Sequence, residues 1–290
     1  MIIYLGYFIL NEKHKDGGSP SSVTAYYNSI IQHIKKFIEN NKMLLLFLDS
    51  STNKQILNIM NIEIPNNIII LNLEYEETYM YKTYYNKFKE QILNNEIILA
   101  PFYNCKQDLE KDSSLTTEER ITRHTNLLKT LLIWNTKFEL FNKAKNYILD
   151  NNLDFSHICY LDVGIWRTDR IRFIKYFHEA NFNIHTLNKI NINFDPKLFN
   201  LPINYKNLLY KGHYEVAANH ICLSILIIDD FFEKFKKTFV DINNKYKFIT
   251  TEQRYLRLIL PQYNVKDITC YRNQKNCSYT IDFHNPPIDY

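Results

Sequence analysis

Glycine is scarce in this sequence, with only five residues among 290. Loops that wrap a phosphate with backbone N–H groups need closely spaced glycines, and neither GxGxxG nor GxxxxGK[ST] occurs in the chain. The GxSxG turn that carries the nucleophile of α/β-hydrolases is absent as well. These absences argue against a Rossmann dehydrogenase, a P-loop enzyme and a hydrolase with a serine elbow.

The sequence also lacks the cysteine spacing of a stapled or zinc-bound protein. Its five cysteines form no CxxC pair, and Cys159 and Cys222 lie in apolar runs, which is typical of small buried hydrophobic residues. We therefore expect a reducing compartment, the cytoplasm. The apolar N-terminus is ten residues long and has no basic region before it, so the sequence predicts neither a transmembrane segment nor a signal peptide.

Charge and composition give few indications of a partner. The chain has 35 Lys and Arg against 31 Asp and Glu, a net charge of +4 that is dispersed along the sequence. Dispersed charge of this kind is typical of solvated helix faces, so no nucleic-acid partner is predicted. The abundance of Tyr, Phe, Asn, Lys and Ile indicates an A/T-biased genome. Individual Asn, Lys and Tyr residues are therefore discounted as functional signals.

What the sequence does contain is an alternation of apolar runs and helical patterns. MIIYLGYFIL, MLLLFLD and NNIIILNLEY are continuous apolar runs, and Ile30, Ile34 and Ile38 have helical spacing between the first two. A second helix is expected over Lys54–Ile62. Apolar strands joined by crossover helices predict a parallel sheet. The predicted fold class is therefore α/β, with a mostly parallel central sheet flanked by helices, in one domain over residues 1–290.

The rest of the chain continues in the same manner. Residues 75–98 are predicted to be helical, and residues 112–150 to contain one or two more helices, the second of them from about Arg123 to Leu149. HICYLD follows as a short buried strand. ICLSILIIDD is predicted as a strand or helix start that leads into an amphipathic helix, and TTEQRYLRLIL as another helix. The tail from Asp267 onward is expected to be irregular.

Two of the predicted strands end in a carboxylate, Asp49 and Asp162. Ligands of open α/β sheets bind beyond the carboxyl ends of the strands, where an acidic residue can hold a divalent cation. After Asp162, Gly164 permits close backbone approach, Trp166 can stack, and Arg167 can pair with an anion. The alternative is that Asp162 caps a turn made by Gly164. Local spacing leaves both interpretations open.

Three other polar residues are candidates, each with a structural alternative. Lys137 precedes the Asp162 strand and could meet a phosphate, or it could be a solvated helix lysine. Glu252 begins a helix after Thr250 and Thr251, where it could act chemically or only complement the helix dipole. His284 lies in the tail and could be a ligand or an ordinary surface or core histidine.

The order of these segments carries a family resemblance. IIYLGYFILNEK, KMLLLFLDS, LLKTLLIWNTKFELFNKA, HICYLDVGIWR, KGHYEVAANH and ITTEQRYLRLIL follow one another through most of the chain. In this order the chain resembles the HtrL/YibB family of predicted glycosyltransferases. The resemblance implies the GT-A-like, nucleotide-sugar-binding fold. One departure concerns the metal site, because enzymes of this fold commonly carry Asp-x-Asp where this chain has Asp162-Val163-Gly164.

The resemblance also implies roles for individual residues. Glu252 and Asp162 would be catalytic, with Glu252 as the base of an inverting scheme, and Asp162 and His284 would hold a divalent cation (Mn²⁺ or Mg²⁺). Gly212 and His213 would line the acceptor side. The nucleotide-sugar donor, as co-substrate, would be bound by Asp49, Lys137, Asp162, Gly164, Arg167 and Gln253.

The predicted function is therefore transfer of a sugar from a nucleotide-sugar donor to a glycan or other hydroxyl acceptor, as in glycan biosynthesis. One alternative is a nucleotide-sugar-binding or carbohydrate-binding protein with degenerate chemistry, which the missing second Asp favours. Another is a structural or interaction module whose aromatic residues form a protein-binding surface. The sequence predicts neither the donor sugar nor the oligomeric state.

Overall fold

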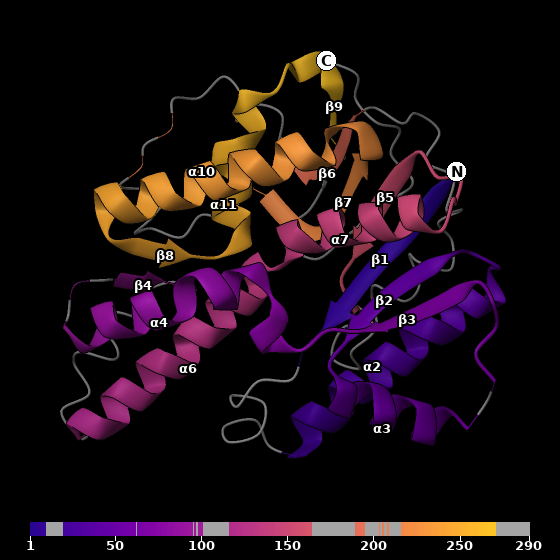
Figure 1. Cartoon of the computed structure of the whole chain (residues 1–290), viewed down its shortest axis with the longest axis horizontal. Coiled ribbons are helices and arrows are strands. Elements are labelled where there is room, and N and C mark those ends of the chain that lie inside the picture. Colours follow the sequence, from indigo (N-terminus) through magenta and orange to yellow (C-terminus); the bar gives the residue numbers. More distant parts are fainter. Residues whose placement is uncertain are drawn as a thin grey trace.

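The structure is a computed structural model. It describes residues 1–9, 20–61, 63–94, 96, 98–100, 116–163, 189–194, 203, 205, 208 and 216–270. Within these residues seven strands form one sheet, in the order β3-β2-β1-β5-β7-β6-β9 (Figure 1). The strands are β1 (Ile2–Phe8), β2 (Leu44–Leu48), β3 (Ile68–Asn72), β5 (His157–Leu161), β6 (Ile190–Phe194), β7 (Val216–Ser224) and β9 (Ile268–Cys270).

Four of the six strand pairings in this sheet are parallel, as the prediction of a mostly parallel sheet requires, and the other two are the pairings of β7. Strands β1, β2, β3 and β5 are parallel to one another, and β6 is parallel to β9. Only β7 runs the other way among the described strands, antiparallel to both β5 and β6. The central strands are buried on both faces, which explains their unbroken apolar sequences. The predicted α/β class is confirmed.

Two helices cover one face of the sheet, α2 (Pro20–Glu39) and α3 (Ser50–Met60). Both were expected, but α3 begins at Ser50 and not near Lys54. The reason is a cap, because the Asp49 carboxylate accepts a hydrogen bond from the backbone N–H of Thr52 at 2.9 Å. The first turn of α3 is polar, so the apolar periodicity of the sequence did not reveal it.

The opposite face carries the larger core, built with helices from several parts of the chain. They are α4 (Tyr79–Leu93), α6 (Thr117–Asn135), α7 (Lys137–Asp150), α10 (Ile228–Tyr246) and α11 (Glu252–Ile259), with the short 3-10 helices η1 (Tyr75–Glu77), η5 (Ile225–Ile227), η6 (Leu260–Gln262) and η7 (Val265–Asp267). Aromatic side chains join them. The Phe138 and Phe235 rings stack with centroids 3.9 Å apart, which links α7 to α10.

The predicted long helix from Arg123 to Leu149 is wrong, because it is divided into α6 and α7 at Thr136. No glycine or proline marks this junction in the sequence. The division coincides with a contact from a distant segment, since the side chain of Asn135 donates a hydrogen bond to the carbonyl of Thr250 at 2.8 Å. Periodicity does not detect a break of this kind.

A second, two-stranded parallel sheet pairs β4 (Ile98–Ala100) with β8 (Phe248–Thr250). Ile98, predicted as the last residue of a helix over residues 75–98, is thus the first residue of a strand. The prediction of an irregular tail is also wrong for Ile268–Cys270, which form β9. Cys159 and Cys222 are buried and free, as expected.

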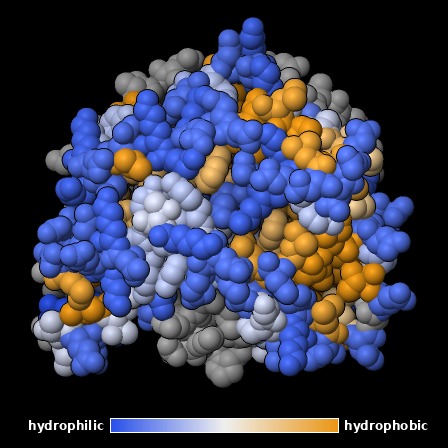
Figure 2. All heavy atoms as spheres, in the orientation of Figure 1, coloured by the Kyte–Doolittle hydropathy of each residue, from blue (hydrophilic) through white to orange (hydrophobic). Residues whose placement is uncertain are grey.

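The surface is mostly hydrophilic on the face seen in Figure 2. Hydrophobic side chains gather over the β2–β3 edge of the sheet, where Ile69 and Leu71 are partly buried (Figure 2). Among the helices that the structure describes, none combines the length and the apolar composition that a membrane crossing needs.

Candidate functional site

The candidate site lies at the carboxyl ends of the central parallel strands. Strand β5 ends at Leu161, and the half-buried Asp162 follows it. Strand β1 pairs with β5, and Leu5 of β1 lies opposite Tyr160 of β5. Tyr7, two residues further along β1, has its side chain in the same hydrophobic core as Leu5 and Tyr160. Because the carboxyl ends of parallel strands meet at one edge, Asp162 and Tyr7 belong to the same region of the molecule.

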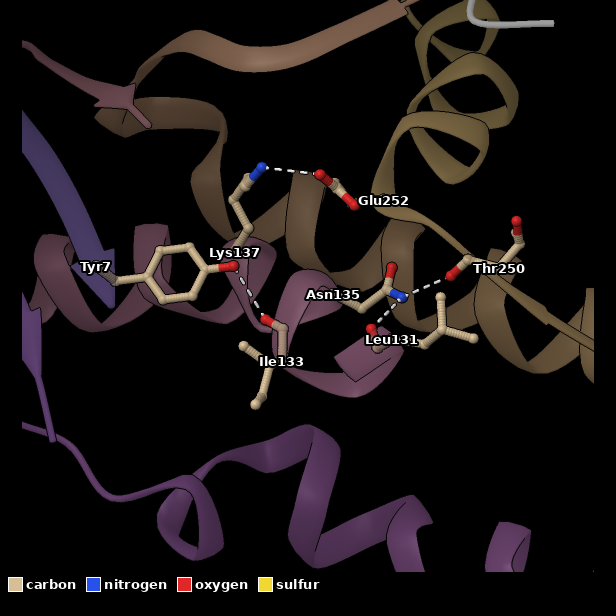
Figure 3. A network of polar contacts seen from close by, with 7 residues as sticks. All are labelled: Tyr7, Leu131, Ile133, Asn135, Lys137, Thr250 and Glu252. Atoms are coloured by element: carbon tan, nitrogen blue, oxygen red, sulfur yellow. Dashed lines mark hydrogen bonds and ion pairs between the residues drawn. The ribbon is translucent and has the colours of Figure 1, made fainter. Parts of the chain in front are cut away.

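Lys137 is the first residue of α7 and is buried, with 4% of its surface exposed. The interpretation of Lys137 as a solvated surface lysine is therefore wrong. Its Nζ lies 3.0 Å from Oε1 of Glu252 (Figure 3) and 4.5 Å from the centroid of the Tyr160 ring. A cation at the start of a helix opposes the helix dipole, and burial adds a desolvation cost. The carboxylate and the aromatic ring offset that cost.

Glu252 is the first residue of α11 and follows directly on β8. Its place in the first turn of a helix is confirmed. The residue is 8% exposed. Its Oε1 accepts a hydrogen bond from the Lys137 ammonium, and its Oε2 is buried without a hydrogen-bond partner among the described residues. The N-cap Thr251 makes no side-chain capping bond. A carboxylate that only complemented the helix dipole would have no need of a buried lysine 115 residues away.

Tyr7 and Tyr160 complete the surroundings of this ion pair, and their rings lie 5.8 Å apart. The Tyr7 hydroxyl donates a hydrogen bond to the carbonyl of Ile133 at 3.0 Å (Figure 3). Burial raises the pKa of Tyr7, and the nearby carboxylates of Glu252 and Asp162 raise it further. Burial likewise raises the pKa of Tyr160, with Asp162 as the next cause. Both phenols are therefore neutral hydrogen-bond donors at physiological pH.

Asp162 and Glu252 thus both raise the pKa of the same two phenols, Tyr7 and Tyr160. The structure thus brings together three residues that the sequence had proposed, namely Lys137, Asp162 and Glu252. Sequence reasoning missed both tyrosines. They stand on apolar strands and were discounted with all other tyrosines as compositional bias, so no local signal marked them.

Asn135 holds the two distant segments of the site in register. Its side-chain Nδ2 donates to the carbonyl oxygens of Leu131 and Thr250, each at 2.8 Å (Figure 3). Two residues further along each segment, Lys137 meets Glu252. The α6–α7 junction and the β8–α11 junction are therefore joined by two polar bridges with the same spacing. Arg254 of α11 adds a contact back to β8, because its Nη1 donates to the Thr250 hydroxyl at 2.7 Å.

Asp49 lies at the end of β2 and is 5% exposed. Its Oδ1 accepts from the Ser51 hydroxyl at 2.6 Å and from the Thr52 backbone, and its Oδ2 accepts from the Thr52 hydroxyl at 2.7 Å. Both oxygens thus serve the start of α3. Gln253, the other donor-side candidate, is half-buried, and its Oε1 is buried without a partner among the described residues.

Five of the candidate residues lie outside the residues that the structure describes. They are Gly164, Arg167, Gly212, His213 and His284. Their predicted roles stay predictions.

A divalent cation would need further ligands besides Asp162. In the described part of the chain, no three His, Cys, Asp or Glu side chains are grouped so that they could hold a metal ion. Glu252 is the other carboxylate of the site, and the Lys137 ammonium 3.0 Å from it opposes a second cation there. Among the described residues, therefore, the carboxylates of the site are Asp162 and Glu252, and no third metal ligand is grouped with them.

Comparisons with known proteins find similarity to solved structures at low sequence identity. No protein-family model and no curated protein sequence matches the chain. Among solved structures, the chain is similar to the galactosyltransferase LgtC in complex with donor and acceptor sugar analogues, with a TM-score of 0.39 and 11% identity over 89% of this chain and 70% of LgtC. An active-site mutant of LgtC gives a TM-score of 0.40 with the same identity and coverage.

Proposed function

We propose that this chain is a glycosyltransferase, which transfers a sugar from a nucleotide-sugar donor to a hydroxyl group of a glycan or other acceptor. The observation that supports it most is the buried pair of Lys137 and Glu252, which stands at the carboxyl edge of the sheet within electrostatic reach of Asp162. The resemblance of the ordered sequence segments to the HtrL/YibB family supports the same function.

Lys137 is suited to meet the diphosphate of the donor. Its ammonium lies in a desolvated place beside the Glu252 carboxylate and the face of the Tyr160 ring. Charge-assisted hydrogen bonds to phosphate strengthen where water is excluded. As the bond from the anomeric carbon to the phosphate oxygen breaks, its electron pair leaves on the nucleoside diphosphate, and the positive charge of Lys137 stabilises that leaving group.

Glu252 is the proposed general base. When Lys137 turns toward a diphosphate, Oε1 of Glu252 is released and can take the proton of the acceptor hydroxyl as its oxygen attacks the anomeric carbon. One lysine would then couple donor binding to activation of the base. Asp162 would contact the ribose and diphosphate side of the donor. A divalent cation, if Asp162 and His284 hold one, would add further charge neutralisation of the diphosphate.

A thermal-shift panel tests this function. The full chain is melted with UDP-sugars and GDP-sugars, with and without Mn²⁺, and the same mixtures are assayed for donor hydrolysis. The glycosyltransferase assignment predicts a rise in melting temperature with at least one nucleotide-sugar, together with slow release of the nucleoside diphosphate. A shift without hydrolysis would support a binding protein with degenerate chemistry, and no shift at all would support an interaction module.

A further inference from the structure

Besides Oε1 of Gln253, two acceptor oxygens next to the Lys137–Glu252 pair are buried and have no donor in the part of the chain that the structure describes. They are Oδ1 of Asn135 and Oε2 of Glu252. Asn135 is fully buried and Glu252 is 8% exposed. In Figure 3 the amide oxygen of Asn135 points to the side on which the Glu252 carboxylate lies. Since a carboxylate oxygen and an amide carbonyl oxygen are both acceptors, a group that binds between them has to be a hydrogen-bond donor.

The orientation of the Asn135 amide is fixed by its neighbours. Its NH₂ group donates to the carbonyls of Leu131 and Thr250, both at 2.8 Å. A flipped amide would set its oxygen against two carbonyl oxygens, so this network assigns Oδ1 to the opposite side. Glu252 is constrained in the same way, because Lys137 takes Oε1 and leaves Oε2. The two unpaired oxygens are therefore a consequence of the two polar bridges.

The charges around the two oxygens favour one kind of hydrogen-bonding group over others. A metal ion or an ammonium group beside Glu252 would be repelled by the Lys137 ammonium, which lies 3.0 Å from the same carboxylate. A neutral hydroxyl group carries no such penalty and offers the missing hydrogen. A buried acceptor that stays unpaired costs about 1–3 kcal/mol, so a ligand with a hydroxyl at this place is favoured over one without it.

We propose that Asn135 is a specificity-determining residue, whose Oδ1 accepts, together with Oε2 of Glu252, hydrogen bonds from hydroxyl groups of the transferred sugar. This inference rests on the proposed function. It gives the two oxygens of Glu252 different roles, because Oε1 is the general base and Oε2 contacts the sugar. Both oxygens, which the bound sugar would meet, are shielded from solvent. The same shielding strengthens the hydrogen bonds.

The first experiment uses the unaltered chain. UDP-glucose, UDP-galactose and the other nucleotide-sugars of the panel are compared with analogues in which one hydroxyl at a time is replaced by fluorine, which does not donate a hydrogen bond. For the nucleotide-sugar that is turned over, replacement of one hydroxyl should lower kcat/KM by about 10- to 100-fold, because a buried acceptor loses its hydrogen-bond donor. Costs below about threefold at every position would overturn the inference.

The second experiment tests whether Asn135 accepts the hydrogen bond from that hydroxyl. Asn135→Leu should turn over the parent donor and the sensitive analogue at rates within about threefold of each other, because it has lost the acceptor that distinguishes them. The control is Asn142→Leu, which removes the amide that bonds to Asp229 at the surface of α7. It should keep the full discrimination. Retained discrimination in Asn135→Leu, with its fold verified by circular dichroism, would also overturn the inference.

The outcomes distinguish a failure of the specificity role of Asn135 from a failure of the proposed glycosyltransferase function. If a donor is turned over but all fluorinated analogues behave alike, the specificity role of Asn135 fails and the glycosyltransferase function stands. If no nucleotide-sugar binds or reacts, the proposed function fails, and the inference fails with it. The series with the unaltered chain gives this answer even if Asn135→Leu does not fold.

Discussion

Two buried carboxylates in different regions of the molecule have opposite surroundings. Asp49, in the region of β2 and α3, is 5% exposed, and both of its oxygens are hydrogen-bonded to residues within three positions in the chain. Glu252, at the start of α11, is 8% exposed, and its one bonded oxygen depends on Lys137, 115 residues away. The first carboxylate is satisfied by its own helix, whereas the second is held by the tertiary structure.

This difference indicates where chemistry can take place. A carboxylate whose oxygens are all taken by a helix start has little left to offer a ligand. A buried carboxylate with one ion pair and one unpaired oxygen can exchange its partner and accept a proton or a hydrogen bond. The predictions below test this contrast between a structural and a functional carboxylate.

The largest effect is expected at Asp162, which ends a strand as Asp49 does. Asp162→Asn should reduce sugar transfer to background, because it removes the negative charge at the donor side of the site. The melting temperature should stay within a few degrees, since the residue is only half-buried. Asp154→Asn, an exposed change before the same strand, is the control for turnover. Substantial transfer by Asp162→Asn would mean that the site lies elsewhere.

The base is tested by Glu252→Gln. Removal of a general base typically lowers turnover by a factor of about 10²–10⁴, while the amide keeps the size of the side chain. Donor binding, followed by calorimetry, should persist. The control is Glu233→Gln, at an exposed carboxylate that pairs with Lys236 on α10. Equal turnover in both variants would reduce Glu252 to a structural residue like Asp49.

The buried pair should appear in stability as well. Lys137→Met leaves the Glu252 charge buried without its partner, which typically costs about 3–5 kcal/mol in the free energy of unfolding. Adding Glu252→Gln to the same chain should restore most of that loss. The measurement is urea unfolding of the single and double variants.

Two further results bear on Lys137. Lys145 lies on α7, as Lys137 does, and forms a surface pair with Asp229 of α10; Lys145→Met should cost less than about 1 kcal/mol. Where Lys137→Met folds, the dissociation constant for the nucleotide-sugar should rise while that for the free sugar stays unchanged. An unchanged donor constant would remove Lys137 from the donor site.

Acid should weaken the region of α2 through His33. Burial lowers the pKa of His33 from 6.5 to about 3, so in the unfolded chain the side chain takes up a proton that the folded chain refuses. Its contribution to stability is complete above pH 6.5 and is lost below it, by about 1.4 kcal/mol per pH unit. His33→Gln should therefore show a shallower loss of unfolding free energy between pH 6 and about 4. Above about pH 7 the two curves should run parallel, because both side chains are then neutral. Identical slopes in acid would contradict the assignment.

The smallest effect is expected at Asp49. Asp49→Ala should lower the free energy of unfolding by about 1 kcal/mol through loss of the helix cap, whereas Asp49→Asn should stay near the original value because Asn caps equally well. Both are followed by urea unfolding. A weaker donor affinity in Asp49→Asn would give this residue the donor-binding role that its strand end suggested.

The α/β class, the parallel half of the sheet and most of the helices follow from the sequence by itself. Strands buried on both faces need unbroken apolar runs such as that of β2, and helices packed on a sheet need apolar residues at helical spacing, as in α2. Such patterns involve residues that are close in the chain, so they can be recognised in the sequence alone. The sequence also proposed Lys137, Asp162 and Glu252, which the structure places in one site.

Only the tertiary structure decided which polar residues meet. The division of the helix at Thr136, the strand β9, the contacts of Tyr7 and the bridge from Asn135 to Thr250 depend on partners far away in the chain. A buried polar group has to find a partner wherever the fold supplies one, and no local periodicity encodes that choice. The sequence thus determined the layers of this protein, and long-range burial of polar groups determined its site.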